Sequence, residues 1–159
     1  STIASNGMSA VNARDRIGGG PWYNYAGAMI ARDATHLHSE DVNLTKETQL
    51  NERGSIVNGR GDSPNMHDIL TGSNLDGTSY TGGEGYTNCD NWTSSGEGST
   101  RVGHHDRQGG GENPNSWNSA HNSRGCSQEN LQATGGNGFY YCFGSPDEQL
   151  GVEPKLPRE

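Results

Sequence analysis

Apolar residues occur along this chain in short groups, separated by long polar stretches rich in glycine. Residues 22–30 (WYNYAGAMI) alternate aromatic and small side chains, which predicts a strand that folds back through a turn. Residues 138–143 (GFYYCF) carry the strongest strand signal. The apolar pairs at 56–57 and 69–70 allow strands of about three residues each. The pattern therefore predicts short strands joined by loops.

The remaining segments predict turns, loops and a tail. Residues 1–17 predict a short helix or turn that ends at the Gly-Gly-Gly-Pro sequence. Residues 34–50 predict a short helical turn, and Asn-Leu-Asp-Gly at 74–77 predicts a turn. Residues 82–123 are nearly all glycine, serine, asparagine and charged residues, which predicts a long ordered loop held by disulfides. Prolines in residues 145–159 predict an extended tail.

The composition favours a loop-rich folded domain with a small core. Only 28% of the residues are hydrophobic, and the mean hydropathy of -0.94 is by itself typical of disorder. However, 3 Trp, 6 Tyr and 3 Cys are not typical of a disordered chain. The length suits one domain, and no stretch approaches the roughly 20 apolar residues of a membrane span.

Charge and cysteine spacing limit the classes of partner and compartment. A net charge of -8 without a basic stripe predicts no nucleic-acid partner. Cys89, Cys126 and Cys142 form no CxxC pair, so the spacing predicts no structural zinc site. Scattered cysteines in a small Gly-rich domain indicate a secreted, periplasmic or cell-surface protein. Because three is odd, one cysteine lacks a partner in this chain, and both a free thiol and an outside partner remain open.

No catalytic motif is present. The chain has no GxSxG, no HExxH, no P-loop and no GxGxxG after a strand, so we name no catalytic residue and expect no enzyme. Abundant His, Asp and Ser leave a hydrolase of unrecognised type as an alternative.

Several segments together resemble a known fold. They are TNCDNWTSS at 87–95, VGHHDR at 102–107, SWNSAHNSRGCS at 116–127 and GFYYCF at 138–143, with NARDRIGGGPWYN, NGRGDSPNMHDILTGS and Asp76-Gly77 in support. Over residues 1–144 the chain resembles a C-type-lectin-like domain, and more closely the bacterial secreted lectin-like domains related in fold to endostatin. The resemblance implies an α+β, C-type-lectin/endostatin-like fold with short antiparallel strands and long ordered loops, stapled by disulfides.

The resemblance also implies a cysteine pairing. In that family an additional N-terminal strand-helix unit carries a cysteine that pairs with the last one, and residues 1–144 are expected to lack this unit. We therefore expect Cys89 to bond Cys126, with a Cα separation below about 7 Å. Cys142 would pair with a cysteine upstream of Ser1 or on another chain.

The lectin-like resemblance implies binding of a carbohydrate or surface polymer. One loop offers the motif Arg-Gly-Asp, which is open to three interpretations: a structural fold motif, a ligand site or integrin adhesion. The other loop contains the densest polar cluster. The predicted contact residues in the two loops are Arg60, Asp62, Asn65, His67, Asp68, His104, His105, Asp106, Asn113, Asn115, Trp117 and Asn118.

Metal binding is a further alternative for these residues. Adjacent His104 and His105 point in opposite directions on an extended chain, so both cannot easily bind one metal. His36 and His38 would share one face of a strand and form a better pair. Hydrogen-bonded loop histidines without a metal are the plainer interpretation.

Residues 112–118 (ENPNSWN) resemble the calcium and sugar loop of C-type lectins. Asn113 interrupts the Glu-Pro-Asn triplet, and Ser119 replaces the final Asp, which removes a charged calcium ligand. Without calcium, asparagine amides and an exposed tryptophan ring still suit a sugar. The weak calcium candidates are Glu112, Asn115, Asn118 and Asp106.

The other aromatic residues are predicted to be core. Trp92 and Trp117, each near a cysteine, are expected to pack on the disulfide, and Trp22, Tyr23 and Tyr25 are expected to be buried. A structural or assembly subunit of a larger extracellular complex remains an alternative function. In that case Cys142 or the tail at 145–159 would contact a protein partner.

Overall fold

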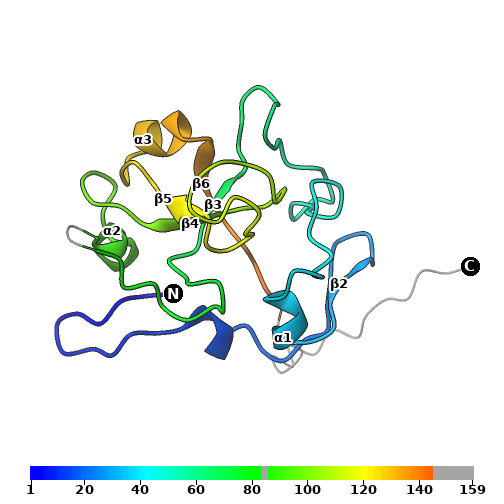
Figure 1. The fold of residues 1–159 in the computed structure, drawn as a ribbon, viewed down its shortest axis with the longest axis horizontal. Helices are drawn as coiled ribbons and strands as arrows, with labels where there is room; N and C mark the ends of the chain where they lie inside the picture. The colour runs from blue at the N-terminus through cyan, green and yellow to red at the C-terminus, as the bar shows by residue number, and fades with distance from the viewer. Residues whose placement is uncertain (84–85, 145–159) are drawn as a thin grey trace, which may run out of the picture.

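A four-stranded sheet organises the larger part of the chain (Figure 1). The computed structural model describes residues 1–83 and 86–144, so the predicted tail at 145–159 lies outside the described residues. The strand order is β5-β4-β3-β6, where β3 is antiparallel to β4 and parallel to β6, and β4 is antiparallel to β5. The strands are β3 (Asp68–Leu70), β4 (Arg101–His104), β5 (His121–Asn122) and β6 (Gly136–Tyr140).

A two-stranded hairpin forms a second, smaller unit. Strands β1 (Trp22–Tyr23) and β2 (Met29–Ala31) pair antiparallel, which confirms the strand and turn predicted for residues 22–30. The short helix α1 (Ala34–Leu37) follows directly, and the Asp33 side chain caps it by accepting a hydrogen bond from the His36 N–H. In Figure 1 the hairpin and α1 lie at the opposite end of the molecule from α3.

Most local predictions are confirmed, and one helix is an addition. The turn at 74–77 is present, and β3 coincides with the apolar pair at 69–70. Strand β6 begins two residues earlier than the predicted strand and ends three residues earlier, and the pair at 56–57 forms only an isolated bridge from Ile56 to Leu50. For residues 1–17 the predicted short helix or turn is confirmed: Thr2 bridges Val11 in a hairpin-like loop, and the short 3-10 helix η1 (Ala13–Asp15) follows. The helix α3 (Gln128–Ala133), capped by Ser127, was not predicted.

The segment 82–123 contains regular structure where the sequence predicts only a loop. It holds α2 (Asn88–Trp92), a turn with left-handed backbone, together with β4 and β5. Strand β4 is buried along its whole length, although it contains Arg101 and His104. Arg101 is tolerated there because its guanidinium bonds Glu112 and the Ser119 hydroxyl. A buried polar strand carries no apolar periodicity, so the hydropathy pattern does not reveal it.

The disulfide between Cys89 and Cys126 is confirmed. The two Cα atoms are 5.6 Å apart, and both residues are buried. The bond joins α2 to the turn before α3 and is compatible with an extracellular protein. Cys142 is an exposed free thiol, and its pairing outside the chain stays a prediction. Within the described segments, every helix is too short and too polar to cross a lipid bilayer.

Two small apolar clusters form the core. One contains Trp22 and Trp117, and Tyr141 packs against it; the other contains Leu70, Val102 and Leu131, with Trp92 half-buried beside it. The predicted burial of Trp22 and Trp117 is confirmed, and Trp92 is half-buried; neither apolar cluster contains Cys89 or Cys126, so packing of Trp92 and Trp117 on the disulfide stays a prediction. The predicted burial of Tyr23 and Tyr25 is wrong: alternation along β1 turns Tyr23 outward, and Tyr25 lies in the hairpin turn.

Candidate functional site

The register of the four-stranded sheet gathers three ionisable side chains on one face. Asp68 on β3 pairs with His104 on β4, and Val102, two residues before His104, pairs with His121 on β5. Side chains two residues apart in a strand share a face, so Asp68, His104 and His121 point to the same side. His67 immediately precedes β3, and its ring stacks on that of His104 with centroids 4.3 Å apart.

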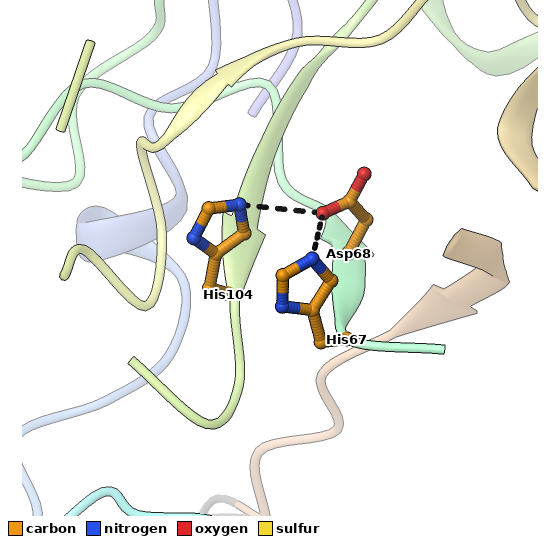
Figure 2. Close-up of side chains that lie close together, drawn as sticks. All are labelled: His67, Asp68 and His104. Atoms are coloured by element: carbon orange, nitrogen blue, oxygen red, sulfur yellow. Dashed lines mark ion pairs between the residues drawn. The ribbon is translucent and has the colours of Figure 1, made fainter. Parts of the chain in front are cut away.

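The imidazole rings converge on one carboxylate oxygen. Figure 2 shows His67 and His104 directed at the same oxygen of Asp68. The Nε2 atoms of His67, His104 and His121 lie 3.3, 3.4 and 3.5 Å from Asp68 Oδ1. We call these four residues the His–Asp cluster.

The other nitrogen of each ring has its own acceptor. His67 Nδ1 lies 3.2 Å from Asp106 Oδ1, His104 Nδ1 lies 2.7 Å from the Pro114 carbonyl oxygen, and His121 Nδ1 lies 3.0 Å from its neighbour's carbonyl oxygen. A carbonyl or carboxylate oxygen only accepts, so each Nδ1 carries the proton. In each neutral ring Nε2 therefore presents a lone pair to Asp68.

The cluster is buried, and part of it has no hydrogen-bond partner. Asp68 is 3% exposed and His104 is 0% exposed, while the His121 side chain at 23% lies at the edge. Three atoms of the cluster have no hydrogen-bond partner among residues 1–83 and 86–144: both carboxylate oxygens of Asp68 and the Nε2 atom of His104. A buried polar atom without a partner is costly, so this arrangement calls for a positive charge or a proton donor between the groups.

Burial and hydrogen bonding shift the pKa values around the cluster in opposite directions. Burial lowers the pKa of His104, which keeps this ring neutral at pH 7. The interaction with Asp68 raises the pKa of His121. Burial alone would raise the pKa of Asp106, but hydrogen bonds from His67 and from backbone N–H groups lower it well below its usual range. Asp106 is therefore a charged acceptor behind His67.

A glycine-rich loop closes over the cluster. A Cβ at Gly109 would collide with the His104 ring, and a Cβ at Gly111 would collide with the His121 side chain. Only glycine lets the backbone approach these rings so closely. Gly109 and Gly111 are therefore needed for the loop to pack directly on the His–Asp cluster.

Most of the predicted contact residues are not placed to touch a polymer from solvent. Seven of the twelve are buried: His67, Asp68, His104, His105, Asp106, Trp117 and Asn118. Trp117 donates its indole N–H to the Leu37 carbonyl oxygen, and Asn118 donates to the Asn74 carbonyl oxygen. These two are structural, so the predicted exposed tryptophan for sugar stacking is wrong. Arg60 and Asn115 are exposed, and Asp62, Asn65 and Asn113 are half-buried.

The Arg-Gly-Asp loop has a structural role through its aspartate. Asp62 accepts a hydrogen bond from the Gly59 N–H and pairs with Lys46. The backbone N–H of Arg60 donates to Asp106, 2.6 Å away, which ties this loop to the one that carries the polar cluster. The fold-motif interpretation explains Asp62, while the exposed Arg60 side chain remains free for a ligand.

Three of the four weak calcium candidates bond to separate partners, and the fourth, Asn115, is exposed. Glu112 binds Arg101, Asp106 binds His67, and Asn118 binds backbone carbonyl oxygens. The sequence departs from the lectin triplet at Asn113, and in the structure the candidate oxygen ligands likewise do not gather at one point.

The predicted pairing of His36 and His38 is wrong. The two residues lie at the end of α1, not on a strand, and bond separately to the Asp41 and Ala34 carbonyl oxygens. The divergence of His104 and His105 is confirmed, since His105 Nε2 lies 3.1 Å from the Asn58 carbonyl oxygen, away from Asp68. The metal-capable group is instead His67, Asp68 and His104, the one such group among the described residues.

An aromatic groove of about 640 Å³ lies beside the hairpin. Its rim carries exposed aromatic side chains from two regions: Tyr23 and Tyr25 from the hairpin, Tyr140 from β6. Its floor is apolar and includes Trp22 and Ile69. Asn24, Gln49, Asn51 and Asn58 line it as well. Both amide atoms of Asn24, the Asn51 Oδ1 atom and the Asn58 Nδ2 atom already make hydrogen bonds within the protein.

The Tyr25 ring is held in place on one side and open on the other. A Cβ at Gly54 would lie 2.5 Å from Tyr25 Cδ1, so the ring lies directly against the backbone there. Nevertheless Tyr25 is 71% exposed, the most exposed large apolar side chain among the described residues. The arrangement presents a ring surface to solvent.

Sequence reasoning missed two groups of functional candidates. His121 was overlooked because it lies 17 residues from His104 in sequence and meets Asp68 only through the sheet register. Tyr23 and Tyr25 are predicted to be core, and Tyr140 is predicted only as part of a strand, so none of the three is named as a contact residue. The signal that was available is the strict alternation of Trp22 and Tyr23, which requires one of them to face outward.

The chain matches no known protein family, no curated protein and no solved structure. The mixed α+β architecture is established, while the lectin-like fold and its function remain proposals.

Proposed function

We propose that this chain is an extracellular binding module whose aromatic groove takes a neutral carbohydrate chain. The observation that carries the proposal is the set of exposed rings on the rim of one polar-edged groove, above all Tyr25. An aromatic face stacks on the C–H surface of a pyranose, and amide groups fix its hydroxyls from the side. The groove thus offers both kinds of contact that a sugar needs, with the amide contacts coming from Gln49, Asn51 Nδ2 and Asn58 Oδ1.

The net charge of the protein favours a neutral polymer over an anionic one as the ligand. At -8 the protein repels anionic polysaccharides and nucleic acids at long range, which favours a neutral glycan. The carbohydrate proposal keeps the ligand class that the lectin-like resemblance implies. It moves the site from the predicted loops to the groove beside β1 and β6. The disulfide supports an extracellular or periplasmic location.

We expect Tyr25→Ala to weaken binding to a neutral glycan about tenfold, because a stacked aromatic contact contributes about 1–1.5 kcal/mol. The measurement is a glycan array with neutral glucans, mannans and N-acetylglucosamine polymers beside acidic glycans, followed by titration of the best soluble ligand. Added calcium should leave binding unchanged, because Glu52 is the one carboxylate among the described lining residues and calcium needs several oxygen ligands.

The matched controls are Tyr25→Phe, which keeps the ring, and Leu75→Ala, which removes an exposed apolar side chain outside the groove. Both should bind as the unmodified protein does. Absence of binding to every glycan would refute the proposal, and so would binding that Tyr25→Ala leaves intact.

A further inference from the structure

We propose that the His–Asp cluster is a structural site for one divalent transition metal ion, with Zn²⁺ as the preferred ion. His67, Asp68 and His104 supply three ligands through Nε2, Oδ1 and Nε2, and His121 supplies the fourth from β5. The inference concerns a site apart from the groove, because none of the four residues lines it.

The spacing of the ligand atoms fits a tetrahedral ion. Atoms bound to Zn²⁺ at about 2.0–2.1 Å in tetrahedral geometry stand about 3.3–3.5 Å from one another. The three Nε2 atoms lie 3.3–3.5 Å from Asp68 Oδ1. The ligand atoms of His67, Asp68 and His104 all lie within 4.8 Å of one another, so small side-chain rotations bring them to one centre. His121 is not part of that group; its Nε2 atom lies 3.5 Å from Asp68 Oδ1, and its ring has to rotate toward the centre to become the fourth ligand.

The hydrogen bonds behind the rings fit metal ligation as well. A metal-bound histidine characteristically donates its other N–H to a carboxylate or a backbone carbonyl oxygen, which fixes the ring and directs the lone pair. All three rings have such an acceptor: Asp106 for His67, Pro114 for His104 and Asn122 for His121. Asp106 is thus a positioning residue, held in turn by the backbone N–H groups of Arg60 and Gln108.

Protons satisfy this cluster less well than a metal does. Each Nδ1 faces its own acceptor, so one added proton can join Asp68 Oδ1 to only one of the three Nε2 atoms, and hydrogen bonds to Asp68 from more than one ring require more than one imidazolium ion. His67 and His104 stack in parallel at 4.3 Å in a buried site, where two such cations repel strongly. One divalent ion satisfies Asp68 Oδ1 and the Nε2 lone pair of His104 together.

The donor set and burial define the class of ion and its role. Three imidazoles and one carboxylate suit Zn²⁺, Cu²⁺, Ni²⁺ or Fe²⁺ better than calcium, which prefers oxygen ligands alone. Four protein ligands under the closed loop at Gly109 leave no open position for substrate, so the role is structural. The absence of CxxC pairs excluded only the thiolate type of zinc site.

The test is direct metal binding by the whole chain. After dialysis against a chelator and reloading with Zn²⁺ alone, elemental analysis should give one zinc per chain. Zinc at a hundredfold excess over its dissociation constant should raise the Tm by about 5–10 °C. Substitution by Co²⁺ should give the intense visible absorption of a tetrahedral site.

The variants locate the ion. Asp106→Asn should weaken zinc binding by roughly 10- to 100-fold while leaving one site, and Asp68→Asn should weaken it by more than that. His121→Asn, at the edge of the cluster, keeps the assignment testable if the buried variants do not fold. His36→Asn is the matched histidine control and should bind zinc normally.

Absence of stoichiometric zinc, with a Tm unaffected by zinc and chelator, overturns the proposal in favour of a protonated hydrogen-bond network. Zinc binding that survives both Asp68→Asn and His121→Asn overturns the assigned ligands.

Discussion

Gly103→Ala is expected to prevent stable folding, with a loss of more than about 3 kcal/mol in the free energy of unfolding. A Cβ at this position would overlap the backbone carbonyl group of Trp117 and the backbone nitrogen of Asn118. Backbone atoms cannot rotate away as a side chain does. Gly103 also pairs with Ile69 at the centre of the sheet, so a displaced β4 would separate the strands that hold both core and cluster.

The measurement is urea denaturation followed by tryptophan fluorescence, with near-UV circular dichroism where the variant is already unfolded. Gly110→Ala is the matched control, because nothing lies within 4 Å of a Cβ at Gly110. It should keep or slightly raise the stability, by up to about 1 kcal/mol. A Gly103→Ala protein whose free energy of unfolding stays within about 0.5 kcal/mol of that of the unmodified protein would contradict the close approach of the two backbones.

Removal of the disulfide is the second large effect. The double variant Cys89→Ala/Cys126→Ala should lose about 3–4 kcal/mol, because the bond closes a loop with a sequence separation of 37 and so restricts the unfolded chain. Alanine is chosen because both sites are buried, and a serine hydroxyl there would add a desolvation cost.

Urea denaturation of the oxidised protein and of the double variant measures this difference. Cys142→Ser is the control: its side chain is exposed, so the change should stay within about 0.5 kcal/mol. If the double variant were as stable as the control, native strain or a compact unfolded state would be cancelling the loop entropy.

Local features of the fold were predictable because their causes are local. The alternation in residues 22–30 produced the hairpin β1–β2, and Asp33 capped the short helix α1. Short-range turn chemistry likewise placed the turn at 74–77. The disulfide came from a different source, the resemblance, and its geometry confirmed it.

The candidate site was predictable only in part. His67, Asp68 and His104 were all named as functional residues, but as contacts in two exposed loops. The structure instead buries them and adds His121. Polar residues carry no hydropathy signal for burial, and whether a histidine faces solvent or a carboxylate depends on which strand pairs with its own.

The sequence by itself determined the chemistry available to this protein: few apolar residues, an acidic charge, three cysteines and six histidines. Tertiary structure alone decided where that chemistry lies. The pairing of β3 with β4 and of β4 with β5 brings Asp68, His104 and His121 together across up to 53 residues of sequence. The same sheet places Tyr140 on the groove rim with the hairpin tyrosines. The reason is physical: strand register is fixed by contacts between distant segments, and no local pattern records it.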